Sequence, residues 1–146
     1  MNKKRVIAWL LWISALLLIF FFSSQNGTAS SGLSNGLLKT LEDLFHIPLT
    51  SPIFSYLIRK FAHFTEFLWL GLWTSYLFSQ YRTLHKREIL CCLLFCFFYA
   101  CTDEIHQIFV GGRVASPIDV LIDFSGSAVG IFLGYLWKRK KAVIFQ

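Results

Sequence analysis

Residues 89–109 read ILCCLLFCFFYACTDEIHQIF, an apolar run that passes without a break into a charged segment. Its uninterrupted apolar part, Ile89–Cys101, has only 13 residues. A helix needs about 20 residues to cross the hydrocarbon core of a bilayer, which is about 30 Å thick. A helix that crosses the membrane must therefore continue to about Phe109. It then includes the charged residues between Cys101 and Phe109. This stretch predicts both a membrane span and a polar site within it.

Three other apolar runs have the length and composition of membrane spans. The four expected spans cover about residues 6–22, 61–79, 89–109 and 118–137. The whole chain is 55% hydrophobic and 15% charged, with a mean hydropathy of +0.58, whereas soluble domains carry about 25% charged residues. This composition excludes an ordinary soluble fold and a disordered chain. We expect one all-α membrane domain over residues 1–146.

The segment between the first two expected spans has a different pattern. Over residues 30–46, leucines recur at helical spacing with polar and charged residues between them. Such a helix is too polar to cross a membrane and is typical of an amphipathic helix that lies on its outer surface. Pro48 ends this helix. Ser51-Pro52 and Ser116-Pro117 each have the pattern of a helix start, with serine as the N-cap and proline in the first turn.

Lysine and arginine are distributed unevenly between the two sides. The side of the N-terminus has ten of the 14, namely Lys3, Lys4, Arg5, Arg82, Lys86, Arg87, Lys138, Arg139, Lys140 and Lys141. The opposite side has Lys39, Arg59, Lys60 and Arg113. Because cytoplasmic flanks carry the excess of Lys and Arg, we expect both termini in the cytoplasm, with residues 23–60 and 111–116 outside. Topology thus explains the net charge of +6, and we expect no nucleic-acid partner.

Polar residues of three expected spans gather near their outer ends. Ionisable groups at membrane depth are costly and usually face a cavity or one another, and on each helix they are spaced three or four residues apart, on one face. We therefore expect one shared ligand-binding site. Its candidate residues are Arg59, Lys60, His63, Glu66, Asp103, Glu104, His106, Gln107, Arg113, Asp119 and Asp123.

The same residues also allow a purely structural interpretation, in which a salt-bridge network fixes the register of the helices without binding anything. Asp119 would then be a helix cap, and Arg113 a loop charge that meets lipid phosphates. Gly126, Gly130 and Gly134 are four residues apart, which predicts close helix packing next to Asp123.

Taken together, the motifs resemble the VanZ-like family of small bacterial membrane proteins, and the resemblance covers nearly the whole chain. The motifs are SSQ at 23–25, RKFAHFTE at 59–66, DEIHQIFV at 103–110, Arg113, SPIDV at 116–120, and Gly126 with Gly130. Three residues differ from the family's common pattern: Phe67 replaces a tyrosine, Gly111 a proline and Asp123 an asparagine. The family's namesake lowers susceptibility to teicoplanin. The resemblance therefore implies a place in the cell envelope and a role in glycopeptide resistance, but no reaction.

Three functions remain open. In the first, which we favour, Arg59, Lys60 and Arg113 bind an anionic lipid or cell-wall precursor at the outer leaflet of the membrane. The second is a membrane-embedded enzyme without a serine or cysteine nucleophile motif. Its candidate acids and bases are His63, Glu66, Asp103, Glu104 and His106. The third is a small carrier or accessory subunit, although the inner halves of the spans lack the polar residues of a transport path.

A metal site has weak support in the sequence. His63, Glu66, His106 and Asp123 could bind a hard cation, but no zinc-binding spacing occurs, and the four cysteines lack the CxxC pattern. We therefore expect no metal and no cofactor. The sequence makes no prediction of the oligomeric state.

Overall fold

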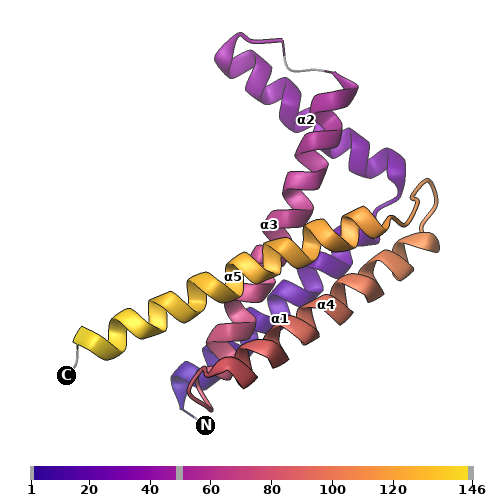
Figure 1. The fold of residues 1–146 in the computed structure, drawn as a ribbon. Coiled ribbons are helices and arrows are strands. Elements are labelled where there is room, and N and C mark those ends of the chain that lie inside the picture. The colour runs from indigo at the N-terminus through magenta and orange to yellow at the C-terminus, as the bar shows by residue number, and fades with distance from the viewer. Residues whose placement is uncertain (1, 49–50, 145–146) are drawn as a thin grey trace.

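The computed structural model describes residues 2–48 and 51–144, with side chains up to residue 139. Over these residues the fold is entirely helical, as expected (Figure 1). The five helices are α1 (Lys3–Ser23), α2 (Gly27–Phe45), α3 (Pro52–Phe78), α4 (Lys86–Ile108) and α5 (Pro117–Ile144). Helices α3 and α5 begin at the two Ser-Pro sites that the sequence indicated, and the Ser51 side chain accepts from the backbone N–H of Phe54.

Among the described residues, three helices are long and apolar enough to cross a membrane: α1, α4 and α5. They contain the first, third and fourth expected spans. Helix α3 has 27 residues and contains most of the second expected span. Over a membrane-spanning length, its mean hydropathy is lower than that of α1, α4 and α5. His63 and Glu66 lie within its apolar part and lower that hydropathy. The second of the four expected spans therefore remains a prediction.

Helix α2 is the amphipathic helix that the leucine spacing predicted. It begins three residues earlier than expected because Asn26 caps it, accepting from the backbone N–H of Ala29 at 2.8 Å. It ends at His46, whose φ of 58° is in the left-handed region, two residues before Pro48. Figure 1 shows α2 and the first turns of α3 projecting from one end of the bundle.

The glycines of α5 bring it into backbone contact with α3. A Cβ at Gly126 would lie 2.2 Å from the carbonyl oxygen of Phe64, and one at Gly130 would lie 2.1 Å from that of Leu68. Gly71 makes the reciprocal contact from α3, with the carbonyl oxygen of Ser127. The close packing predicted from the glycine spacing is confirmed.

The basic segments meet at the end of the bundle that contains the N-terminus. The guanidinium of Arg5 lies 4.7 Å from the ring centroid of Tyr81, in the α3–α4 loop. A cavity of about 450 Å³ at the same end is lined by Arg82, Lys138 and Arg139. Helix α2 and the α4–α5 turn lie at the opposite end (Figure 1). The bundle thus has the segments predicted to be cytoplasmic at one end and those predicted to be outside at the other.

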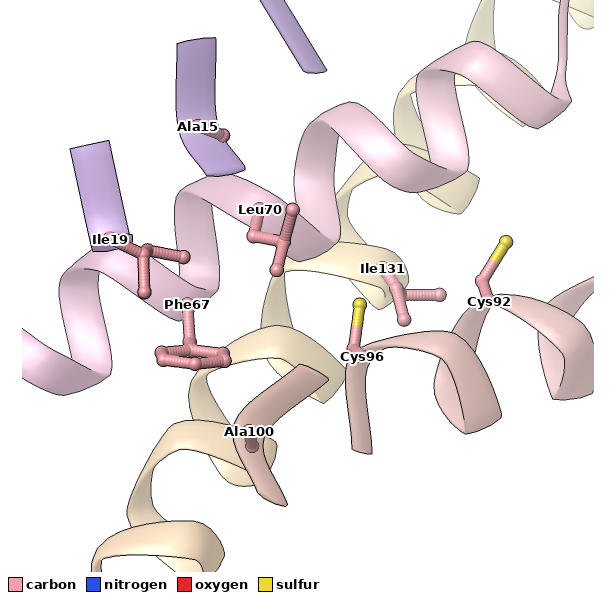
Figure 2. Close-up of a cluster of buried hydrophobic side chains, with 8 residues drawn as sticks. All are labelled: Ala15, Ile19, Phe67, Leu70, Cys92, Cys96, Ala100 and Ile131. Atoms are coloured by element: carbon pink, nitrogen blue, oxygen red, sulfur yellow. The ribbon is translucent and has the colours of Figure 1, made fainter. Parts of the chain in front are cut away.

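A small apolar core separates the two ends (Figure 2). Its members are buried side chains from four helices: Ala15, Ile19, Phe67, Leu70, Cys92, Cys96, Ala100 and Ile131. Around it, large apolar side chains such as those of Leu17, Phe98 and Phe132 are more than half exposed, as expected for helices that face lipid. The buried ionisable residues lie between this core and the end of the bundle where α2 lies.

Candidate functional site

Three buried ionisable side chains from three helices meet at this end. His63 of α3, Asp103 of α4 and Asp123 of α5 are 8%, 6% and 0% exposed, and each has a potential ligand atom within 4.8 Å of those of the other two. His63 Nδ1 lies 3.5 Å from Asp123 Oδ1, and neither atom has a hydrogen-bond partner among the described residues. We call these three residues the buried cluster.

Asp103 is held in place by side chains of α1 and α4. Its Oδ2 atom accepts from Ser23 Oγ at 2.9 Å and from Gln107 Nε2 at 2.9 Å. Gln107 lies one turn after Asp103, so the same face of α4 supplies both side chains. Ser23, the last residue of α1, is 1% exposed. The two hydrogen bonds fix the Asp103 carboxylate relative to the end of α1.

Arg113 joins this network from the α4–α5 turn. It donates from Nη2 to the carbonyl oxygen of Phe22 at 3.2 Å, from Nε to that of Gln25 at 3.1 Å, and from Nη1 to Gln107 Oε1 at 3.3 Å. Carbonyl groups at the end of a helix lack intrahelical donors. Arg113 donates to one such carbonyl group, that of Phe22 in α1. Burial, together with the nearby Arg59 charge, lowers the pKa of Arg113 from its ordinary value.

The α4–α5 turn is itself docked on the start of α2. The backbone N–H of Gly27 donates to the carbonyl oxygen of Gly111 at 3.0 Å. Gly112 has a φ of 76°, and a Cβ on Gly27 would lie 2.2 Å from the Gly112 carbonyl oxygen. Only glycines allow this approach and this left-handed backbone. The turn thereby places Arg113 between α1 and α3.

Two cavities adjoin the buried cluster. One, of about 180 Å³, lies between α2 and α3 and is lined by Glu66 together with α2 residues such as Leu33 and Ser34. The other, of about 330 Å³, lies between α3 and the turn that leads to α5. Arg59, His63 and Arg113 line both cavities. Two cations and one member of the buried cluster therefore share the same open space.

A family model named VanZ/LLP1 matches residues 7–138. The chain belongs to this family. The match includes the buried cluster, both cavities and the α4–α5 turn, and it confirms the resemblance seen in the motifs. No curated protein and no solved structure matches the chain. Family membership and the apolar helices identify a VanZ-type membrane protein.

In this VanZ/LLP1 chain, Lys60 and Asp119 pair with each other across the second cavity. Their side chains form an ion pair that joins α3 to the first turn of α5. The Lys60 ammonium also lies 5.0 Å from the ring centroid of Tyr56. Asp119 therefore braces two helices, one of the structural roles considered from the sequence.

Two candidate residues use their polar atoms away from the buried cluster. Glu104 Oε2 accepts from the backbone N–H of Ser116 at 2.8 Å, because successive residues of α4 are rotated by about 100° and Glu104 cannot share the face of Asp103. His106 Nε2 is 3.1 Å from Ser24 Oγ, and its ring stacks on Phe20. The geometry does not pair either residue with His63.

Sequence reasoning did not include Ser23, Gln25 or Tyr56 among the site residues of this VanZ/LLP1 protein. Ser23 and Gln25 appeared only as part of a motif. A serine directly after an apolar run was the available signal for Ser23. Gln25 acts through its backbone carbonyl, which no side-chain pattern reveals.

Proposed function

We propose that this VanZ/LLP1 protein is a multi-pass protein of the bacterial cell membrane that binds an anionic lipid headgroup or cell-wall precursor at the outer leaflet. In this proposal α1, α3, α4 and α5 are its four spans, and both termini are cytoplasmic. The gathering of the basic segments at one end of the bundle supports this orientation. Helix α3 packs against α5 through the glycines, and the two ionisable residues of its apolar part, His63 and Glu66, line the cavity between α2 and α3, which supports its crossing.

The observation that carries the proposal is the pair of arginines in the two cavities. Arg59 makes no hydrogen bond or ion pair with any residue the structure describes, and its guanidinium contacts only the Tyr56 ring, 6.0 Å away. Arg113 has five N–H donors, of which three are used within the protein. Guanidinium groups bind phosphate and carboxylate oxygens with two parallel hydrogen bonds. An anionic group between Arg59 and Arg113 would therefore accept hydrogen bonds from the unused N–H groups of both side chains.

The surface beside the cavities suits the apolar part of such a ligand. On α2, Leu33 and Leu37 are 59% and 50% exposed; on the first half of α3, Ile53, Leu57 and Phe61 are 71%, 51% and 69% exposed. Apolar side chains next to a cationic pocket are expected where a protein meets the boundary of headgroups and acyl chains. Helix α2 would then lie in the outer leaflet, above the pocket.

The biological role that we propose is lower susceptibility to lipoglycopeptides such as teicoplanin. Teicoplanin has a lipid tail that brings it to the outer leaflet, where a bound or masked envelope precursor would be less available to it. This role requires binding and no chemical step. Two of the five candidate acids and bases, Glu104 and His106, have partners outside the buried cluster, which supports a binding role.

Lipid analysis of the purified protein tests the binding. Anionic lipids that co-purify with the wild type should be lost or strongly reduced in Arg59→Ala, and the variant should still fold, because Arg59 makes no hydrogen bond or ion pair with the described residues. Lys39→Ala is the matched control, since Lys39 is an exposed cation of α2 that lines neither cavity. Equal amounts of anionic lipid in all three proteins would contradict the proposal.

A further inference from the structure

We propose that the buried cluster of His63, Asp103 and Asp123 binds one divalent metal ion of the Mn²⁺ or Zn²⁺ type. The inference rests on the geometry and the unpaired atoms of these side chains, and it does not depend on the proposed binding of an anionic lipid.

The geometry of the cluster fits a single ion. Three helices each supply one ligand atom, and all three atoms lie within 4.8 Å of one another. Ligands bound to one ion at about 2.0–2.6 Å can lie no more than about 4–5 Å apart. The separation of 3.5 Å between His63 Nδ1 and Asp123 Oδ1 is too long for a good hydrogen bond. It suits two neighbouring ligands of one ion.

The unpaired atoms point to a missing cation. Asp123 is 0% exposed, yet within the part of the chain that the structure describes neither of its carboxylate oxygens has a hydrogen-bond partner, and His63 Nδ1 has none either. Both hydrogen bonds to Asp103 end on Oδ2, which leaves Oδ1 for another partner. Buried charges in proteins are normally paired or bound to metal ions.

Apart from His63, which would pair with Asp123 if its ring were protonated, the neighbouring cations do not neutralise the two carboxylates. Lys60 pairs with Asp119, and the three hydrogen bonds of Arg113 end on carbonyl and amide oxygens. No hydrogen bond or ion pair joins Arg59 to Asp103 or Asp123 within the described chain. A divalent ion would supply two positive charges at the place where two negative charges meet.

The donor set and its surroundings are those of a metal site. One imidazole nitrogen and two carboxylates suit Mn²⁺, Zn²⁺ or Fe²⁺ better than a purely oxygen-binding ion. Hydrogen bonds to a ligand carboxylate orient it toward the metal, and Ser23 and Gln107 provide them for Asp103. Three protein ligands leave further coordination positions open. His63 lines both cavities, so water or a ligand oxygen could reach the ion from there.

A shared proton is the competing explanation. A proton on His63 would make an ion pair with Asp123, and a proton on one carboxyl group would remove one negative charge. A protonated cluster would bind no metal, so metal uptake separates the two explanations.

The test uses the full chain without an affinity tag, purified in detergent and treated with a chelator. Mn²⁺ is added, and the free ion is measured by its electron paramagnetic resonance signal. We expect one Mn²⁺ bound per chain and a higher melting temperature with the ion. Asp123→Asn keeps the shape of the side chain and should weaken binding at least about tenfold, as should Asp103→Asn. Asp43→Asn is the same change at an exposed residue of α2 and should bind like the wild type.

Two results would overturn the proposal: a wild type that takes up neither Mn²⁺ nor Zn²⁺ in a 1:1 ratio, or a folded Asp123→Asn or Asp103→Asn variant that binds as tightly as the wild type. If one of these two variants does not fold, the metal affinity of the other variant tests the proposal. Arg59→Ala should keep its metal, so a failure of the lipid proposal is distinguishable from a failure of this one.

Discussion

Arg113 donates to the carbonyl oxygen of Phe22, 91 residues earlier in the chain, and so ties the α4–α5 turn to the last turn of α1. The second carbonyl partner of Arg113, that of Gln25, follows the same helix end. The Phe22 carbonyl also accepts from the backbone N–H of Gln25 at 3.3 Å, so Arg113 adds a second donor at the end of α1. The same guanidinium also lines the two cavities. Arg113 therefore contributes to the stability of the fold as well as to the candidate site.

Replacement of Arg113 by alanine should destabilise the protein. The change removes three hydrogen bonds from a charged donor, and hydrogen bonds to charged groups contribute about 1.5–3 kcal/mol each, so we expect a loss of at least about 2 kcal/mol. Arg113→Lys should restore little of the lost stability, because a lysine ammonium cannot reach three diverging acceptors. Thermal unfolding in detergent measures the effect. Arg87→Ala, at an exposed residue of α4, is the control, and an unchanged melting temperature in Arg113→Ala would show that the carbonyl contacts are dispensable.

Alanine at Gly126 or Gly130 should push α3 and α5 apart. The new Cβ atom would lie 2.2 Å or 2.1 Å from a backbone carbonyl oxygen of α3, and overpacking of this kind costs about 1–3 kcal/mol or more. Gly36→Ala is the matched control in α2, where a Cβ meets nothing within 4 Å. It should leave stability unchanged or raise it by up to about 1 kcal/mol, because alanine favours a helix. Equal unfolding temperatures for all three variants would contradict the close packing.

Labelling from outside the cell should distinguish the two ends of the bundle. A membrane-impermeant maleimide should modify Asn35→Cys in α2 and should not modify Lys86→Cys at the start of α4, because the basic count places the second residue in the cytoplasm. The wild type, with its four cysteines, sets the background. Labelling of Lys86→Cys alone would reverse the topology and move the cavities to the cytoplasmic side.

Expression in a susceptible Gram-positive host should raise the inhibitory concentration of teicoplanin more than that of vancomycin. The expected difference arises because the lipid tail of teicoplanin holds it at the outer leaflet, beside the proposed site. Arg59→Ala should abolish the effect and Lys39→Ala should preserve it. The measurement requires equal amounts of each protein in the membrane. Inhibitory concentrations that do not change for either drug would remove the support for a resistance role.

Much of the fold is determined locally and was predictable from the sequence. The apolar runs, the two Ser-Pro helix starts and the amphipathic pattern of α2 each depend on neighbouring residues, because helix periodicity and capping act within a few positions. The glycines of α5 predicted a close helix contact for the same reason, since a face without side chains admits another backbone. The polar residues of three helices could also be assigned to one end of the bundle, because their depth follows from their distance along each helix.

The tertiary structure decided which of these polar residues meet. Rotation of α4 about its axis turned Asp103 toward His63 and Asp123 and gave Glu104 a backbone partner at Ser116, and that rotation is set by packing against other helices. The chief partners of Arg113 are carbonyl oxygens, which every residue has and which therefore leave no mark in a sequence. Sequence by itself determined what chemistry the end of the bundle contains; only packing between distant segments decided which side chains brace the helices and which remain available to a ligand.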